Sequence, residues 1–249
     1  SRLYSELDSF SIEADCSSIK PEVSNLIRQS SRPLILIGGG VSNDRTNKQI
    51  VRNFAKNRKI SVVATYGATD VIEHSDELYL GTVGIKGNRA ANFAVQNCDL
   101  LIVLGSRLPF AVIGYDIENF ACNANIIVVD IDHAELQKNE INFPNRLIQY
   151  NLSIQNFLSS IDALEIQQCA EWEKNCKKSR LLWNIISENR EYYKYQGISI
   201  YDIMDELNKL VTTNGVLDCP KLTLAQSQPP PLPSRLSHRT PSPRYAQWD

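Results

Sequence analysis

Five apolar runs, rich in branched residues, alternate along this chain with segments of helical periodicity. The runs are continuous, without the regular polar positions of a strand that has one exposed face. A sheet made of such strands is covered by helices on both faces, and parallel neighbours need the long crossovers that helices provide. The sequence therefore predicts an α/β fold with a parallel sheet across about residues 32–161. The predicted strands are 34–37, 60–66, 99–106, 125–132 and 145–151.

The segments between these runs predict helices and one long loop. A first helix lies within 17–30, and a second covers 47–57. Asn43 or Asp44 precedes the second helix, and either side chain can cap its first turn. Residues 67–87 are punctuated by glycines and predict a loop. The other helices predicted between strands are 88–97, 134–139 and 152–161.

The pattern changes near residue 165. A long helix over 166–193 carries an apolar stripe that includes Trp172 and Trp183, and a second helix covers 199–211. Such stripes are packing faces. Without the surface that they cover, these side chains are predicted to be exposed, and exposed tryptophan faces favour association with another molecule.

The last segment, residues 219–249, holds seven of the eleven prolines and has no periodicity. This composition predicts disorder or partial polyproline II conformation. Its PPPLP stretch could bind a groove of the SH3 type or nothing at all. The abrupt change also fits a tail foreign to the domain, such as a frameshifted or truncated terminus.

Composition and charge exclude several classes of protein. The net charge of −2 gives no reason to expect nucleic acid or an acidic membrane as partner. No apolar run approaches the roughly 18 residues of a membrane span, and residues 1–20 lack the features of a signal peptide. The cysteines form no C-x-x-C pair, which favours reduced thiols and a cytoplasmic location over disulfides or a zinc site. They are residues 16, 98, 122, 169, 176 and 219.

Three features fall where the strands of a parallel sheet end. A glycine triplet follows the first strand, three spaced glycines precede the helix at 88–97, and two aspartates close the fourth strand. Ligands of open parallel sheets bind at this edge, so the set predicts a nucleotide site with amides for phosphates and a carboxylate for ribose. The residues are Gly38, Gly39, Gly40, Gly81, Gly84, Gly87, Asp130 and Asp132.

Each feature also has a structural interpretation. The triplet lacks the third glycine of G-x-G-x-x-G and could simply turn the chain. Asp132 and Glu135 have the spacing of a capping box, and Arg89 and Arg107 could be surface charges. No nucleophile, zinc or Walker motif is present, and the histidines at 74 and 133 are predicted to be solvated. The residues therefore indicate a binding edge without a catalytic constellation.

The order of the motifs resembles the central domain of thiamine-diphosphate-dependent enzymes, and among them the large catalytic subunit of acetolactate synthase. The segments concerned are RPLILIGGGV, the stretch from SVVATYGATD to CDLLIVLGSRL with G-x-x-G-x-x-G-x-x-A-A-N inside it, and NIIVVDIDHAELQKN. The resemblance implies a six-stranded Rossmann-like domain that binds FAD, an adenine nucleotide or nothing. By position, it implies that Gly38, Gly39, Gly40, Gly84, Gly87, Arg89, Arg107, Asp130 and Asp132 line the cofactor cleft.

One departure concerns the stretch from Leu108 to Gly114. Acetolactate synthases usually have two aspartates and an arginine there, and this chain has Ala111 in place of the arginine. A related ligase or decarboxylase therefore fits as well as acetolactate synthesis.

The resemblance also implies a domain organisation. Residues 1–19 would be a linker from a missing N-terminal domain and 20–164 the central Rossmann-like domain. Residues 165–218 would be a helical linker and the start of a truncated C-terminal domain, and 219–249 the proline-rich tail.

In the family, other domains supply the glutamate that activates thiamine diphosphate and the segment that binds Mg²⁺. We therefore expect a fragment that performs no thiamine chemistry alone, from a homo-oligomeric enzyme acting on a 2-oxo acid. The alternatives are a non-catalytic nucleotide-binding or regulatory module, or a remnant that binds no ligand.

Overall fold

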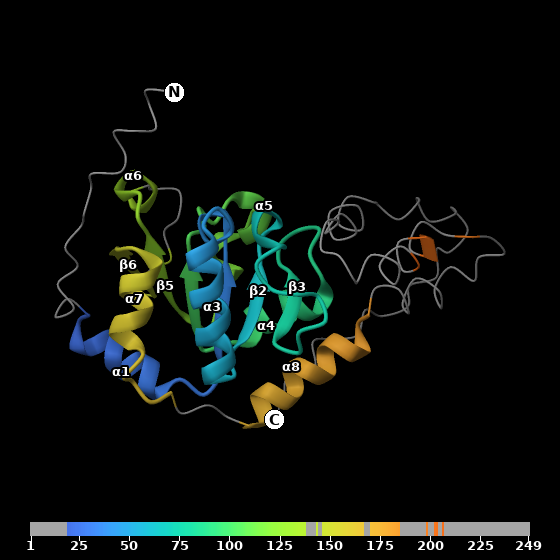
Figure 1. Ribbon diagram of the computed structural model, residues 1–249, viewed down its shortest axis with the longest axis horizontal. Helices are drawn as coiled ribbons and strands as arrows, with labels where there is room; N and C mark the ends of the chain where they lie inside the picture. The colour runs from blue at the N-terminus through green and yellow to red at the C-terminus, as the bar shows by residue number, and fades with distance from the viewer. Residues whose placement is uncertain are drawn as a thin grey trace.

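A computed structural model describes residues 19–137, 143, 146–166, 170–184, 198, 202, 203 and 206. The described residues form a six-stranded sheet in the order β3-β2-β1-β4-β5-β6, in which every neighbouring pair is parallel (Figure 1). Helices cover both faces, so the predicted α/β parallel sheet is confirmed. The strands are β1 (Pro33–Ile37), β2 (Ser61–Ala64), β3 (Tyr79–Thr82), β4 (Leu100–Leu104), β5 (Asn125–Asp130) and β6 (Leu147–Asn151).

Strand β3 corrects the prediction of a loop over 67–87. Its four residues, YLGT, are all buried and pair with β2. The strand is too short to give an apolar run, and Gly81 within it has a φ of 110° beside a register shift in the pairing with β2. Pairing with a buried neighbour outweighs the local glycine signal here. The strand predicted over 60–66 ends at Ala64, and a short 3₁₀ helix, η3 (Tyr66–Ala68), spans the end of that prediction and the start of the predicted loop.

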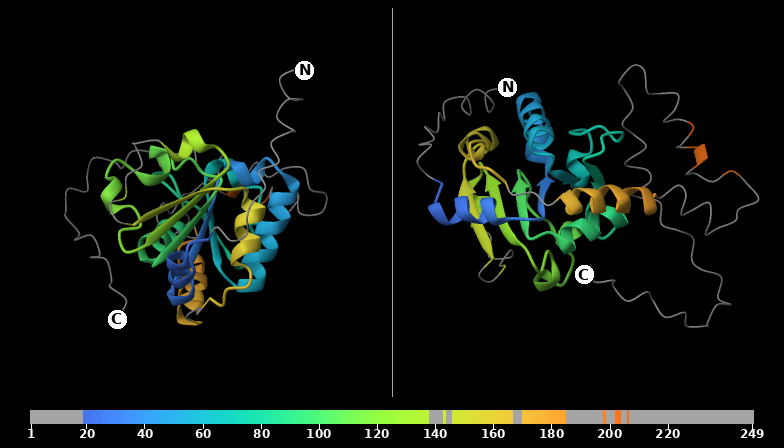
Figure 2. Two further views of the ribbon diagram at one scale, coloured as in Figure 1. Left: turned by 90° about the vertical axis from the view of Figure 1, so that its left-hand side faces the viewer. Right: turned by 90° about the horizontal axis from the view of Figure 1, so that it is seen from below.

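Alternate residues of the central strands face the two helical layers. Ile35 and Ile37 pack with α1, α3 and α7, whereas Leu34 and Leu36 pack with α4, α5 and α8. Figure 2 shows α3 and α7 side by side on one face of the sheet. The helices are α1 (Pro21–Gln29), α2 (Gly39–Ser42), α3 (Arg45–Arg58), α4 (Arg89–Asn97), α5 (Phe110–Ile113), α6 (His133–Leu136), α7 (Ile154–Ile161) and α8 (Ala170–Leu182), with a second 3₁₀ helix, η4 (Ile117–Asn119).

Helix α8 corrects the expected exposure of the tryptophan stripe. Trp172 is only 6% exposed and, with Cys176, packs under the sheet beside α4. Trp183, just past the end of α8, is half-buried, and its ring centroid lies 5.1 Å from that of Phe93. The chain itself therefore supplies the surface for Trp172, and this residue gives no indication of association. Most of the predicted helix at 199–211, and the whole tail at 219–249, lie outside the described residues.

The N-cap of α3 is Asp44, whose side chain accepts a hydrogen bond from the Thr46 amide at 2.7 Å. Of the two predicted caps, Asp44 is thus confirmed. In the described part of the chain, none of the helices has the length and apolar character needed to cross a bilayer.

Candidate functional site

The carboxyl ends of all six strands meet at one edge of the sheet. Beyond β1 the chain crosses to β2 on one side, and beyond β4 it crosses to β5 on the other, so the order reverses between β1 and β4. A reversal of this kind is the usual ligand position in open α/β sheets. The glycine triplet after β1 and the turn after β4 meet at this point, with α5 and α6 also beyond this edge (Figure 1).

The glycine triplet packs directly against the turn after β4. A Cβ atom on Gly38 would lie 2.3 Å from the Gly105 carbonyl oxygen, and one on Gly40 would lie 3.0 Å from the Gly105 Cα. The Gly38 amide donates to the Leu104 oxygen at 2.9 Å, and the Gly40 amide to the Gly105 oxygen at 3.0 Å. These two glycines therefore allow two backbone turns to touch, and their amides are used within the protein.

Gly39 has different surroundings. A Cβ atom on Gly39 would have only the Gly67 oxygen within 4 Å, at 3.8 Å. A side chain at Gly39 would therefore meet only ordinary van der Waals contact, unlike one at Gly38 or Gly40.

The second glycine loop is held by two asparagines that the sequence did not single out. Asn88 accepts hydrogen bonds from the Thr82 amide and hydroxyl at 2.7 and 2.9 Å. Asn92 accepts one from the Gly84 amide and donates one to the Gly84 oxygen, both at 2.9 Å. Asn92 is the asparagine that ends the glycine motif, without a role assigned to it there, and Asn88 offered only its spacing of seven residues after Gly81.

Gly84 and Gly87 are also required by close contacts. Gly84 has a φ of 123°, and a Cβ atom there would lie 2.3 Å from the Ala111 oxygen. A Cβ atom on Gly87 would lie 2.5 Å from the Thr82 oxygen. The loop is thereby folded against α5, and its predicted role in binding a cofactor stays a prediction.

The two aspartates after β5 have separate environments. The Asp130 carboxylate accepts a hydrogen bond from the Asp132 amide at 2.9 Å, and Asp132 caps α6 through the Ala134 amide at 2.9 Å. Burial raises the pKa of Asp130, and the negative charges of Asp132 and Glu135 act in the same direction. Asp132 is thus the N-cap of α6, as expected, but the predicted capping box with Glu135 is not formed, because the Asp132 amide donates to Asp130. Asp130 is the half-buried carboxylate at the edge.

The two predicted arginines lie apart from one another. Arg107 is 71% exposed, and its Nε lies 3.1 Å from a carboxylate oxygen of Glu135, next to the two aspartates. The guanidinium carbon of Arg89 lies 5.7 Å from the centroid of the Trp183 ring, a cation–π distance. The structure therefore places Arg107 at the aspartate side of the edge and holds Arg89 against the end of α8.

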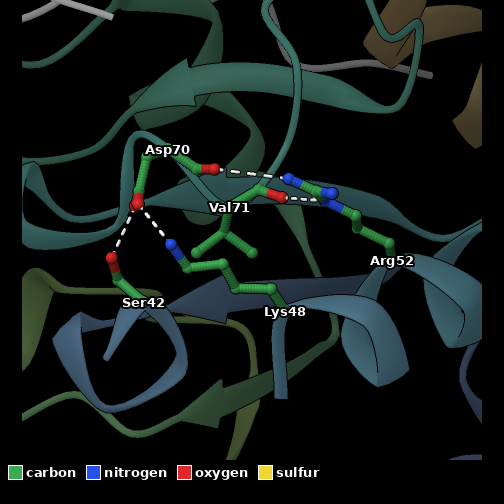
Figure 3. A network of polar contacts seen from close by, with 5 residues as sticks. All are labelled: Ser42, Lys48, Arg52, Asp70 and Val71. Atoms are coloured by element: carbon green, nitrogen blue, oxygen red, sulfur yellow. Dashed lines mark hydrogen bonds and ion pairs between the residues drawn. The ribbon is translucent and has the colours of Figure 1, made fainter. Parts of the chain in front are cut away.

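A polar network fixes the corner between α2 and α3 (Figure 3). Asp70 accepts a hydrogen bond from the Ser42 hydroxyl at 2.5 Å and pairs with Lys48, while Arg52 donates to the carbonyl oxygens of Val71 and Asp70. Partial burial opposes ionisation of Asp70, but the contacts with Lys48 and Ser42 outweigh it and lower its pKa. The network ties the glycine turn to the segment that follows β2.

Tyr66, at the start of η3, carries a buried hydroxyl for which the described residues provide no hydrogen-bond partner. Burial raises the pKa of this phenol. An unsatisfied hydroxyl costs free energy unless water or a ligand completes it. Among the described residues it is the one buried side-chain nitrogen or oxygen without a hydrogen-bond partner, and the backbone of Tyr66 follows β2 at the carboxyl edge of the sheet.

The described residues contain no cluster of three or more His, Cys, Asp or Glu side chains that could hold a metal ion. Cys98 and Cys176 are buried, and burial raises the pKa of both thiols, that of Cys176 to about 12. Thiols of this kind are poor nucleophiles at neutral pH.

Comparison with known proteins agrees with this geometry. Residues 21–147 match the family described as thiamine pyrophosphate enzyme, central domain. The acetolactate synthase large subunit of the red alga Pyropia yezoensis is 43% identical over 116 residues, which is 47% of this chain and 19% of that protein.

Two prokaryotic relatives match over longer stretches. A probable acetolactate synthase large subunit of Methanocaldococcus jannaschii is 35% identical over 191 residues, 76% of this chain and 32% of that protein. The acetolactate synthase isozyme 2 large subunit of Escherichia coli K12 is 31% identical over 179 residues, 71% of this chain and 30% of that protein. The chain thus spans less than a third of the length of these relatives. It belongs to the thiamine pyrophosphate enzyme family, whose central domain it contains.

Proposed function

We propose that this chain provides the FAD- or adenine-nucleotide-binding central domain of an acetolactate-synthase-like enzyme that joins or cleaves carbon–carbon bonds of 2-oxo acids. The observation that carries the proposal is the reversal of strand order between β1 and β4, with the glycine turns and Asp130 at the same edge. In such an enzyme, bound thiamine diphosphate stabilises the carbanion, and this domain would contribute a seat for a second cofactor.

Three features support the fit of a dinucleotide at this edge. At Gly39 only the Gly67 oxygen lies within 4 Å of the position of a Cβ atom, and Tyr66 has a buried hydroxyl without a partner in the described residues. Asp130 is a half-buried carboxylate that could accept hydrogen bonds from ribose hydroxyls, and exposed Arg107 could approach a diphosphate. The amides of Gly38 and Gly40 would support the turn without contacting the ligand, because both already donate within the protein.

The test is titration of the purified full chain with FAD, followed by flavin fluorescence, and with ADP by calorimetry. We expect saturable binding with a Kd below about 100 μM. Asp130→Asn should weaken both ligands, whereas Asp162→Asn, at the end of α7, removes the same charge away from the edge and should change neither. Failure of the parent chain to bind either ligand would overturn the nucleotide-binding role.

A second measurement separates this role from catalysis. We expect no pyruvate consumption above background when the chain is supplied with thiamine diphosphate and Mg²⁺, because the chain spans less than a third of the length of its relatives. Turnover would contradict the assignment of a non-catalytic part. Nucleotide binding without turnover would also fit a regulatory module. If adding the remaining domains of a relative restored activity, that result would favour a domain of an enzyme over a regulatory module.

Ala111 bears on which enzyme this is. The residue lies in α5, beside Gly84, and offers no side-chain charge to a ligand. A ligase or decarboxylase of the same family is therefore as well supported as acetolactate synthesis. Homo-oligomeric assembly and a cytoplasmic location complete the proposal, and light scattering and cell fractionation would test them.

A further inference from the structure

Asn92 makes an unusual pair of contacts with one glycine. Its side-chain oxygen accepts from the Gly84 amide, and its side-chain nitrogen donates to the Gly84 carbonyl oxygen, which also accepts from the Gly87 amide at 2.9 Å. Gly84 lies beyond the end of β3 at Thr82. There, the Asn92 side chain makes the kind of hydrogen bonds that a neighbouring strand would otherwise make to the backbone. Asn92 is half-buried in α4, a rigid element, and can therefore hold the loop in place.

The held residue is the point where the loop meets α5. A Cβ atom on Gly84 would lie 2.3 Å from the Ala111 oxygen, and the next amide, that of Ile85, donates to that oxygen at 2.9 Å. Movement of Gly84 would break this contact between the segment after β3 and the segment after β4. Both segments lie beyond the carboxyl ends of their strands and pack in the same core cluster.

The hydrogen bonds between Asn92 and Gly84, called the Asn92 lock from here on, also affect which amides of the loop can reach a ligand. Between Val83 and Asn88, the amides of Val83, Gly84, Ile85, Gly87 and Asn88 all donate to acceptors within the protein. Within the part of the chain that the structure describes, the Lys86 amide alone among these six has no acceptor. The spaced glycines therefore shape the loop, and they do not serve as a row of phosphate-binding amides.

We infer that Asn92 is a positioning residue for the candidate nucleotide site, holding Gly84 so that the loop over 83–88 is preorganised against α5. The inference rests on the proposed function, since a positioning role requires a ligand to position. Preorganisation of a binding loop lowers the ordering cost of binding, and its loss appears as weaker affinity without loss of the fold.

The test compares Asn92→Ala, Asn92→Asp and Asn97→Ala in the full chain. Asn97 lies in the same helix and donates to the Phe93 oxygen at 2.8 Å, away from the loop, which makes it the matched control. Hydrogen exchange of the Gly84 and Ile85 amides should accelerate about tenfold or more in Asn92→Ala, and Kd for FAD should rise about tenfold. Asn92→Asp, which keeps an acceptor for the Gly84 amide but has no donor for the Gly84 oxygen, should be intermediate. Asn97→Ala should leave both quantities unchanged.

The outcomes are distinguishable. Unchanged exchange in Asn92→Ala would overturn the lock itself. Faster exchange with unchanged affinity would leave a purely structural lock and overturn the positioning role. Absence of FAD and ADP binding by the parent chain would overturn the proposed function and the positioning role with it, while exchange would still decide the lock. Should Asn92→Ala fail to fold, as judged by circular dichroism, the isosteric Asn92→Asp carries the same two measurements.

Discussion

The indole Nε1–H of Trp172 donates to the carbonyl oxygen of Pro33 at 3.1 Å, joining residues that lie 139 positions apart. Pro33 begins β1, so this bond attaches α8 to the amino end of a central strand. Because α8 lies beyond the residues that match the family pattern, the contact shows that the helix is packed as part of the same folded unit.

The Trp172 contact predicts that substitutions there destabilise the whole domain. Trp172→Ala should lower the free energy of unfolding by about 3–5 kcal/mol, because it removes a large buried side chain. Trp172→Phe keeps most of the packing and should cost about 1–2 kcal/mol, mainly for the lost hydrogen bond. Urea unfolding followed by circular dichroism measures both. Equal stability of the three proteins would show that α8 is not part of the cooperative unit.

The glycine triplet predicts opposite responses at adjacent positions. Gly38→Ala would bring a Cβ atom to 2.3 Å from the Gly105 oxygen and 2.5 Å from the Ser106 Cα, so the two turns must separate. We expect a loss of about 1–3 kcal/mol, or failure to fold. Gly39→Ala meets only the Gly67 oxygen at 3.8 Å and should change stability by less than about 1 kcal/mol. Thermal unfolding of the pair checks this, and similar costs at both positions would contradict the packing described.

The sheet was predictable wherever its strands were continuous and buried. Residues 33–37, 100–104 and 125–130 carry an unbroken apolar signal because both of their faces are covered. Strand β3 was not predictable in this way, because its stability comes from pairing with β2 and its own four residues include a glycine.

The sequence allowed us to predict the position of the site at one edge of the sheet, but not the contacts that its residues make. Parallel strands place their carboxyl ends at one edge, so the glycines and aspartates were expected to gather there. The approach of Gly38 to Gly105 and the bonds of Asn92 to Gly84 depend on segments brought together by the fold. A single sequence contains no local signal for such contacts, and for this reason the glycines suggested ligand-binding amides where the structure has internal hydrogen bonds.

The unsatisfied hydroxyl of Tyr66 allows a prediction about the stability of the Tyr66→Phe variant. Its buried oxygen has no partner in the described residues, so Tyr66→Phe removes a desolvated polar group and loses no hydrogen bond. We expect the variant to be as stable as the parent or more stable by about 1 kcal/mol. If FAD or ADP binds, the same change should weaken binding when the hydroxyl contacts the ligand. Destabilisation by more than about 1 kcal/mol would indicate that a buried water satisfies the hydroxyl.

We expect the Asp70 carboxylate to make a contribution to the free energy of unfolding that depends on pH. Partial burial opposes its ionisation, but hydrogen bonds from Lys48 and Ser42 and the charge of Lys48 prevail, so its pKa in the folded protein lies below the ordinary 3.8. Since the folded pKa is lowered, the stabilisation is present in full above the unfolded value. It is lost as pH falls through the folded value, in the range below about pH 4. The side chain is 42% exposed, so solvent screening should keep this contribution below about 1 kcal/mol.

The pH dependence can be isolated with one variant and one control. Asp70→Asn should lower stability at pH 7, and the difference from the parent should be smaller at pH 3, because the stabilisation decreases once the pH falls below the unfolded pKa. Asp162→Asn removes a carboxylate that is 66% exposed and 3.4 Å from Arg58, far from the network, and serves as the control for a change in net charge. Denaturant unfolding at several pH values measures each difference. A difference for Asp70→Asn that persists unchanged at pH 3 would show that the side chain acts through packing alone. In that case Lys48 and Ser42 would not stabilise its charge, and the network would be no more than a steric support for the glycine turn.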